Sequence, residues 1–378
     1  MAVAEEVLAE FRWNNDELAI MVTSDIEVVF RSVPTELVRS VRSVYALRHN
    51  IGNEATLGIW RVEGATGSVV LKVLRPPGQN WSGSWSTSDV PSHWNYWRRE
   101  ALAYDTGLVS TAFARTGVKA VDLLLLRDRT DGMTELWLSE AAGIRGFQWS
   151  PERLARLSYQ LGLGQARWVG NVPSTEWLSC RWMRQYLAQG PARGVQVTNE
   201  DWASEFARFW GPRVLEQLKV LWYEQGRFLS ALEMVDRTLC HLDMWPANVV
   251  DDNGESVLLD WAFVGEGAIG EDIGSLILHS FTDNLMSVDM LPEVAHSSVD
   301  GYLDGLRAGG WVGSSDSVRR SIALSGVTKY CWFAPAVLSR SVNGIVDKSV
   351  YNNDSSAENA MKRTSALVSL VADWSQVL

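Results

Sequence analysis

The sequence predicts an α+β fold of two lobes, an N-terminal antiparallel sheet with one helix and a mainly helical C-terminal lobe that carries a hairpin. Two β-branched segments that flank a glycine-containing turn predict paired strands near the N-terminus. From Pro151 onward the apolar pattern is mainly helical. A tight-turn signal at residues 251–254 interrupts this helical half. We therefore expect an N-terminal lobe over 1–140, including an extension over 1–44, and a C-terminal lobe over 141–378.

The first strands of the N-terminal lobe are predicted around a hairpin. Residues 44–48 lead into a turn-rich segment at 51–58. Residues 59–62 then alternate between apolar and polar, and the glycines of the next four residues, 64–67, are typical of a hairpin turn. Residues 68–73 are rich in β-branched side chains and form the second strand of the pair.

One helix and two more strands should complete this lobe. Residues 76–91 contain much Gly, Ser and Pro and predict a loop. The apolar spacing of residues 94–108 predicts a helix. Two strands follow at 120–126 and 134–139, and residues 140–143 are expected to connect the lobes.

A hairpin in the C-terminal lobe brings two polar residues together. Residues 249–250 and 256–259 are apolar strands, and Asp251-Asp252-Asn253-Gly254 between them is a strong turn signal. The turn folds the chain back on itself, so Asp260 should return close to Asn248. An amide oxygen and a carboxylate placed in this way can share a hard cation.

Composition excludes several classes of protein. The net charge of −11 argues against general nucleic-acid binding, which needs a basic face. No apolar run approaches the roughly 18 residues that span a bilayer, and the acidic N-terminus does not resemble a signal peptide. We expect a cytoplasmic protein without membrane or nucleic-acid partners, as a monomer or homodimer. The three scattered cysteines are expected to be reduced thiols.

Four residues around the hairpin predict phosphoryl transfer. His241, Asp243 and Asn248 are followed across the hairpin by Asp260. Such chemistry needs one carboxylate that orients and deprotonates a hydroxyl, for which we predict Asp243. It also needs oxygen ligands that hold Mg²⁺ on the phosphates, for which we predict Asn248 and Asp260. His241 is grouped with the catalytic residues and is expected to fix the loop. Turn and capping chemistry is the alternative explanation of these residues.

The N-terminal lobe offers a matching nucleotide site. Lys72 stands between apolar residues of a strand, where simple alternation would also permit an exposed lysine. We predict instead that it holds the α- and β-phosphates and pairs with Glu100 of the following helix. Backbone N–H groups of the segment that begins with Gly52 and Asn53 are expected to cover the phosphates. No GxxxxGK[ST] motif occurs, which excludes a P-loop.

In this order, the residues resemble the aminoglycoside phosphotransferase-like branch of the protein-kinase-like fold. The resemblance covers roughly residues 45–280, and the segment 330–333 also looks familiar. Asp260 is followed by Trp-Ala, and only about a dozen residues separate it from Asp272, which leaves no room for an activation loop. The resemblance therefore implies a small-molecule acceptor. Asp272 is expected to be a helix N-cap that braces the catalytic loop.

The resemblance implies ATP or GTP as co-substrate, with its base against the connector at Glu140 and Ala142. The acceptor should lie over the C-terminal lobe near Trp245. The candidate wall residues, each of which ordinary surface or core packing explains more readily, are Asp283, Asp289, Tyr330 and Trp332.

Three functions remain open at this point. The first is phosphorylation of an antibiotic, either an aminoglycoside or another sugar- or nucleoside-containing compound. The second is metabolic phosphorylation of a sugar or amino alcohol. The third is a regulatory pseudokinase, which the complete set of catalytic residues argues against. Several carboxylates in the acceptor pocket would favour an aminoglycoside. An aromatic pocket with few carboxylates would favour a neutral sugar, a macrolide or a nucleoside-type antibiotic.

Overall fold

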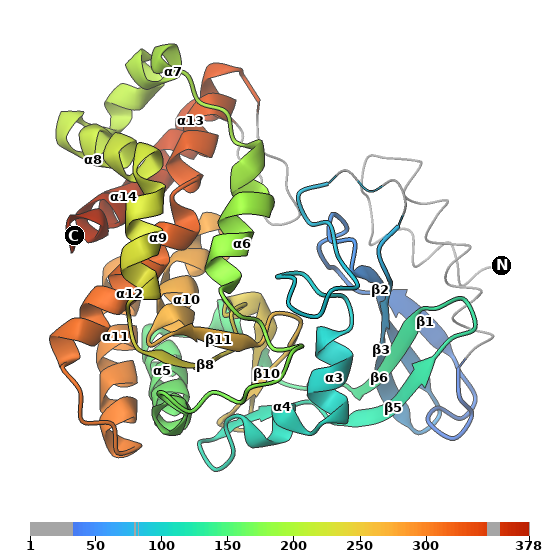
Figure 1. Cartoon of the computed structure of the whole chain (residues 1–378). Coiled ribbons are helices and arrows are strands. Elements are labelled where there is room, and N and C mark those ends of the chain that lie inside the picture. Colours follow the sequence, from blue (N-terminus) through green and yellow to red (C-terminus); the bar gives the residue numbers. More distant parts are fainter. Residues whose placement is uncertain (1–32, 79–80, 82, 346–355, 378) are drawn as a thin grey trace.

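The computed structural model describes residues 33–78, 81, 83–345 and 356–377. It confirms the predicted α+β fold, with a five-stranded sheet at one end of the molecule and a large helical part at the other (Figure 1). Most of the expected extension, residues 1–32, lies outside the described residues.

The five-stranded sheet is antiparallel throughout. Its two central strands form the hairpin that the sequence predicts, and Gly64 pairs with Gly67 at the turn. The strands lie in the order β1 (Ser43–Ala46), β2 (Thr56–Gly64), β3 (Gly67–Leu74), β6 (Thr134–Ser139) and β5 (Leu123–Asp128).

Alternation along β3 decides which way Lys72 faces. Successive residues of a strand point to opposite faces of the sheet. Val69, Leu71 and Val73 pack with Trp137 in a small core on the outer face. Lys72 consequently points to the inner face, where it is buried against the helical part of the molecule.

The predicted helix over 94–108 is wrong at both ends. The N–H of Trp94 donates to Gln185 Oε1, and residues up to Arg98 form turns. Helix α3 covers only Arg99–Asp105, because Gly107 adopts a left-handed φ of 71° and separates it from α4 (Leu108–Thr111).

The predicted strand over 120–126 is also wrong, because the chain changes sheets within it. β4 (Val118–Ala120) pairs in parallel with the C-terminal hairpin, whereas the rest of the segment enters the first sheet as β5. The division into lobes at residue 140 therefore stays a prediction, since a strand of the first part belongs to a sheet of the second.

The C-terminal hairpin forms as predicted. Asn253 and Gly254 at its tip have φ values of 54° and 89°, as a two-residue primed turn requires. Its strands lie in a four-stranded sheet ordered β4, β10 (Glu255–Leu258), β9 (Val249–Asp252) and β7 (Ile144–Arg145).

Helices enclose this sheet and a two-stranded one made of β8 (Arg237–Cys240) and β11 (Gly265–Ala268) (Figure 1). No helix in the described ranges combines the length and apolarity needed to cross a membrane. The helices are α5 (Pro151–Gln165), α6 (Trp182–Gln189), α7 (Asn199–Ala203), α8 (Pro212–Tyr223), α9 (Gln225–Glu233), α10 (Glu271–Thr282), α11 (Leu291–Ala308), α12 (Ser315–Tyr330), α13 (Phe333–Val342) and α14 (Ala357–Trp374).

Close packing of α5 on α11 supports the centre of the C-terminal part. A Cβ atom on Gly305 would lie 2.0 Å from the carbonyl oxygen of Tyr159, so only glycine permits this approach. From the same two helices, Tyr302 donates through its hydroxyl to Gln165 Oε1 at 2.7 Å and accepts the N–H of Gly270 at 3.0 Å.

Gly305→Ala should therefore destabilise the protein. The added methyl group forces the two helices apart, and we expect a loss of about 1–3 kcal/mol in the free energy of unfolding, measured by urea denaturation. Gly226→Ala is the matched control, because Gly226 is exposed in α9 and its Cβ would meet no atom within 4 Å. The control should gain up to about 1 kcal/mol. Equal stability of the two variants would contradict the packing argument.

Candidate active site

Five of the residues predicted to bind nucleotide or metal or to act as base line one cavity of about 1020 Å³. It lies where the inner face of the five-stranded sheet meets the C-terminal hairpin and the ends of α10 and α12. These residues come from four separate segments of the chain: Lys72, Glu100, Asp243, Asn248 and Asp260.

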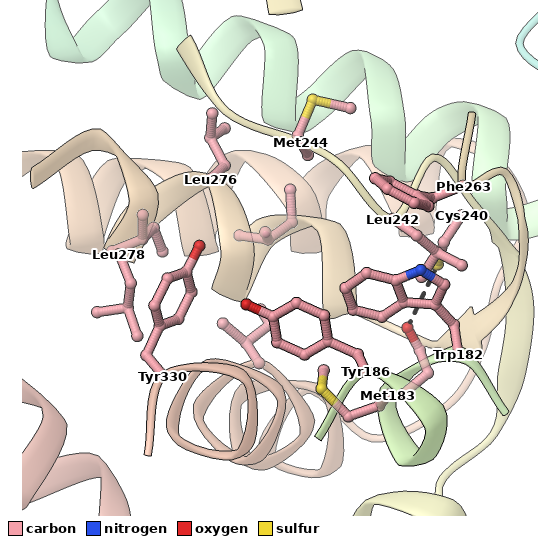
Figure 2. Packing of buried hydrophobic residues seen from close by; sticks show 14 of the residues in the cluster. Trp182, Met183, Tyr186, Cys240, Leu242, Met244, Phe263, Leu276, Leu278 and Tyr330 are labelled. Carbon is pink, nitrogen blue, oxygen red and sulfur yellow. Dashed lines mark hydrogen bonds between the residues drawn. The ribbon is translucent and has the colours of Figure 1, made fainter. Parts of the chain in front are cut away.

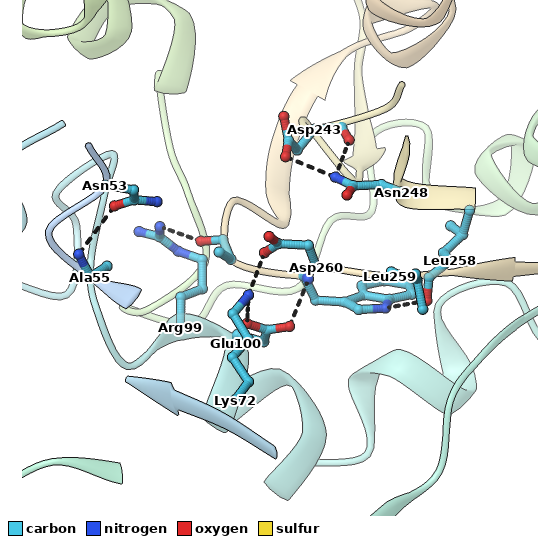
Figure 3. Close-up of polar contacts among 12 residues, drawn as sticks. Asn53, Ala55, Lys72, Arg99, Glu100, Asp243, Asn248, Leu258, Leu259 and Asp260 are labelled. Atoms are coloured by element: carbon cyan, nitrogen blue, oxygen red, sulfur yellow. Dashed lines mark hydrogen bonds and ion pairs between the residues drawn. The ribbon is translucent and has the colours of Figure 1, made fainter. Parts of the chain in front are cut away.

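Lys72 links β3, α3 and the segment after the hairpin. Its Nζ lies 2.6 Å from Glu100 Oε2 and 3.0 Å from Asp260 Oδ1 (Figure 3). Burial alone would lower the pKa of Lys72, but the two carboxylates outweigh it and raise the pKa, so the ammonium is charged at neutral pH. Burial opposes the charge of Asp260 too, yet Lys72 lowers the pKa of this carboxyl.

The backbone around Asp260 holds this arrangement. Asp260 has a φ of 59°, a left-handed conformation that is costly for a residue other than glycine. The next N–H, that of Trp261, donates to Glu100 Oε1 at 3.3 Å. Glu100 thus contacts both Lys72 and the strained segment, and it fixes the position of Asp260 relative to the sheet.

Asp243 and Asn248 lie together on the other side of the cavity. Asn248 Nδ2 donates to Asp243 Oδ2 at 2.9 Å and to the Asp243 carbonyl at 3.0 Å (Figure 3). The N–H of Leu259 donates to the Asn248 carbonyl at 2.9 Å, so the hairpin does bring Asn248 next to Asp260. Because Nδ2 is engaged, Oδ1 is the atom of Asn248 that can bind a cation.

Asp272 braces the loop, but it is not the predicted N-cap. Helix α10 begins at Glu271 after Gly270, whose φ of 88° ends the preceding segment, so Asp272 lies inside the first turn. Its two carboxylate oxygens accept the N–H groups of His241 at 2.9 Å and Leu242 at 2.8 Å. Leu242 has a φ of 66°, so Asp272 holds a strained conformation directly before Asp243.

His241 lies behind the loop. The ring is fully buried, and its Nε2 bonds to the carbonyl of Leu259 at 3.0 Å. Burial lowers the pKa of His241 to about 4, so the imidazole is neutral at physiological pH. It joins the catalytic loop to the end of the hairpin, and we keep it as a positioning residue.

The role predicted for the segment from Gly52 to Gly58, covering phosphates with backbone N–H groups, stays a prediction, and several of these groups donate within the protein. The N–H groups of Gly52 and Asn53 donate to Asn50 Oδ1 and the Asn50 carbonyl. Those of the next three residues donate to Trp85 O, Asn53 Oδ1 and Asn53 O. In this conformation the backbone donors of residues 52–56 are all engaged within the protein.

The connector is only partly where the sequence places it. Glu140 lines the cavity, where it accepts a hydrogen bond from the Ser68 hydroxyl and pairs with Arg61 Nε at 3.0 Å. Ala142, by contrast, is exposed, and Ala141 is the connector alanine that lines the cavity. The twist of the chain after β6 turns Ala142 outward.

Part of the chain matches a known protein family. Residues 144–310 match the model of the phosphotransferase enzyme family, APH. Over these residues the chain is similar to phosphotransferase enzymes. This confirms the resemblance to aminoglycoside phosphotransferase-like proteins that the sequence indicates. No curated protein matches the chain.

Solved structures are similar to this protein at low sequence identity. An amicoumacin kinase, solved with AMP-PNP, Ca²⁺ and amicoumacin, is 13% identical over 92% of this chain and 93% of that one, with a TM-score of 0.52, and shares the fold. A choline kinase from Streptococcus pneumoniae is 14% identical over 91% and 99%, with a TM-score of 0.48. An aminoglycoside phosphotransferase from Streptomyces rimosus, with ADP and streptomycin, is 16% identical over 74% and 94%, with a TM-score of 0.41.

Sequence reasoning missed a buried lysine that lines the cavity of this protein. Lys329 near the end of α12 lines the cavity and is 5% exposed. Its Nζ donates to Ser275 Oγ at 2.7 Å and lies 5.1 Å from the ring centre of Trp182 and 5.8 Å from that of Tyr330. The available signal was a lysine on the buried side of a helix, directly before a tyrosine that was singled out.

Arg99, next to Glu100, was also missed. Its fully buried guanidinium donates to five backbone carbonyls, of which those of Trp177 and Ala262 lie in the C-terminal part. Burial lowers the pKa of Arg99 to about 9, which still leaves it charged at neutral pH. Arg99 thus ties α3 to the segment that carries Asp260. The other three acceptors are the carbonyls of Pro91, His93 and Trp94.

Most residues predicted for the acceptor end do line the cavity. Asp289 does not, because it is exposed outside it. Asp283 accepts a hydrogen bond from His279 Nε2 at 3.0 Å. The residues that line the cavity as predicted are Trp245, Asp283, Tyr330 and Trp332.

His241 should make the protein acid-sensitive. Its pKa falls from 6.5 to about 4 on folding, so below pH 6.5 the unfolded chain takes up a proton that the folded protein does not. The free energy of unfolding should therefore drop between about pH 6.5 and pH 4, by on the order of 3 kcal/mol. Urea denaturation at several pH values, on the wild type and on His241→Gln, measures this.

The variant should lose less stability than the wild type over that range, because glutamine does not titrate. His296→Gln is the matched control, since His296 is 78% exposed, and its stability should follow that of the wild type. Parallel curves for the wild type and His241→Gln would show that His241 does not cause the acid sensitivity.

Proposed function

We propose that this protein transfers the γ-phosphate of ATP or GTP to a hydroxyl group of a small molecule, with Asp243 as the base. The observation that carries the proposal is the assembled pair of clusters in one cavity. Lys72, Glu100 and Asp260 form one cluster, and Asp243 with Asn248 forms the other. A regulatory pseudokinase would have no need of both.

Each residue has a role that its contacts allow. The ammonium of Lys72, held by Glu100, neutralises charge on the α- and β-phosphates. The Asp243 carboxylate accepts a hydrogen bond from the acceptor hydroxyl and so aims the hydroxyl oxygen at the γ-phosphorus. The carboxylate then takes up the hydroxyl proton. Burial raises the pKa of Asp243, and the nearby Lys329 charge partly opposes that rise. A carboxylate with a raised pKa is a better base at neutral pH.

The donor set fits a magnesium ion. Asn248 Oδ1 and the Asp260 carboxylate are hard oxygen donors at the two ends of one hairpin, and both line the cavity. The described residues contain no group of three or more His, Cys, Asp or Glu side chains that could hold a metal. Two protein ligands suit Mg²⁺, which commonly completes its shell with water and substrate phosphates. When bound, the ion supplies charge neutralisation on the β- and γ-phosphates.

An antibiotic is the first acceptor to test. The similarity to the phosphotransferase enzyme family, APH, motivates this choice, and the amicoumacin kinase that shares the fold was solved with amicoumacin and AMP-PNP. The proposed role is then resistance or self-protection. A metabolic sugar or amino alcohol is the second candidate, and a coupled assay of ADP release over antibiotics, sugars and amino alcohols distinguishes them.

Asp243→Asn should abolish most of the transfer and leave nucleotide binding intact. We expect kcat to fall by about 10²–10⁴, because the variant cannot accept the hydroxyl proton. The Kd for AMP-PNP, measured by calorimetry, should stay within about threefold. Asp289→Asn is the matched control, since this carboxylate is exposed outside the cavity. A kcat for Asp243→Asn within tenfold of the wild type would refute the role of Asp243.

A further inference from the structure

The acceptor end of the cavity is walled by aromatic rings. The aromatic wall comprises six residues from α6, the catalytic loop, α10, α12 and the start of α13. Trp182 and Tyr186 are stacked at 4.7 Å between ring centres, and Trp245 and His279 are stacked at 4.4 Å. Figure 2 shows the side chains of Tyr330 and Tyr186 next to each other. The six residues are Trp182, Tyr186, Trp245, His279, Tyr330 and Trp332.

The rings of Trp245, His279 and Trp332 are only partly buried, so the protein does not cover them completely. Trp332 continues the wall beyond Tyr330, with 6.5 Å between the ring centres. Such surfaces bind flat rings by stacking, with a preference for offset or edge contacts. Binding on such a surface buries apolar area of the ligand and needs no charged group on the ligand.

The charges at this end are unfavourable for an amine. Among the described residues, the carboxylates of this end are Asp243 and Asp283, and its buried cation is Lys329. Asp283 is engaged with His279. An ammonium that bound Asp243 would occupy the oxygen needed for the acceptor hydroxyl. No second carboxylate of the described acceptor end can take its place.

Lys329 makes the binding of an ammonium group near Asp243 still less favourable. Its Nζ is fixed between Trp182 and Tyr330 by Ser275 Oγ, and it forms no ion pair with any described residue. Burial lowers the pKa of Lys329, and Asp243 is the carboxyl that most strongly opposes this shift. An ammonium group at the base therefore meets a fixed like charge in a partly desolvated site. Repulsion between two like charges is stronger in such a site than in bulk water, and it weakens the binding of an amine.

We infer that the acceptor is an electrically neutral hydroxyl compound that carries a flat ring, and that polyamines and amino alcohols are discriminated against. The inference rests on the proposed function, because it assigns the acceptor of that same site. It narrows the acceptors to neutral aryl glycosides, nucleosides and similar compounds, and it disfavours aminoglycosides and choline-like alcohols.

Two matched pairs of probes test the inference by binding alone. Calorimetry with the AMP-PNP- and Mg²⁺-loaded protein compares phenyl β-D-glucoside with methyl β-D-glucoside, which differ in the ring. It then compares phenyl β-D-glucoside with phenyl β-D-glucosaminide, which differ in one amino group. We expect the phenyl glucoside to bind at least tenfold more tightly than either partner. Uridine and chloramphenicol, as further neutral ring compounds, should bind more tightly than kanamycin or choline.

Variants assign the preferences to residues. Trp332→Ala should reduce the phenyl-to-methyl ratio at least fivefold, whereas Trp311→Ala, a half-buried tryptophan outside the cavity, should not change it. Lys329→Met should raise the affinity for the glucosaminide relative to the glucoside about tenfold. Lys329→Gln is the second variant if the first does not fold. Lys119→Met, at a lysine 41% exposed and outside the cavity, should leave that ratio unchanged.

The outcomes separate this inference from the proposed function. Kanamycin or choline binding as tightly as the neutral ring compounds, or equal affinities within both glucoside pairs, would overturn the inference. Preferential transfer to an amine compound would do the same and would leave the proposed function standing. Binding of the neutral ring compounds without transfer of phosphate to any of them would instead count against the proposed function.

Discussion

The structure of the site depends on one buried ion cluster, in which Lys72 lies between Glu100 and Asp260. Lys72 and Glu100 are buried and Asp260 is partly exposed, and burying charged groups is costly unless each is paired at short distance. The cluster meets this condition, with N–O distances of 2.6 and 3.0 Å. Since its members come from β3, α3 and the end of the C-terminal hairpin, the cluster requires the sheet, the helix and the hairpin to lie in one relative position.

Further contacts between α3 and the C-terminal part fix that position without a ligand. Arg99 donates to carbonyls on both sides of the cavity, and the N–H of Trp261 donates to Glu100. These contacts hold Lys72, Glu100 and Asp260 in one relative position. Preorganisation of this kind lowers the reorganisation needed during phosphoryl transfer, where positioning and charge neutralisation do most of the catalysis.

The sequence predicted the residues whose spacing is local or whose type is unusual. Asn253-Gly254 specifies a two-residue turn, so the hairpin and the approach of Asp260 to Asn248 could be predicted from a few adjacent residues. The split of residues 120–126 between two sheets could not, because it depends on the pairing of β4 with β10, which is about 135 residues distant in sequence. Asp272 was misplaced as a cap for a similar reason, since its partners are the distant N–H groups of His241 and Leu242.

Lys329 illustrates the same limit at the acceptor end. A lysine in an otherwise buried helix carries no sequence signal for its partners, and only the packing of α12 against α6 and the catalytic loop places it near Asp243. The same packing gathers aromatic residues that are more than 140 residues apart, such as Trp182 and Tyr330. The catalytic loop thus predicts the reaction from its own residues, whereas the charge and shape that select the acceptor arise from tertiary packing. Acceptor choice can therefore change through α12 and α13 while the residues that hold the phosphates stay the same.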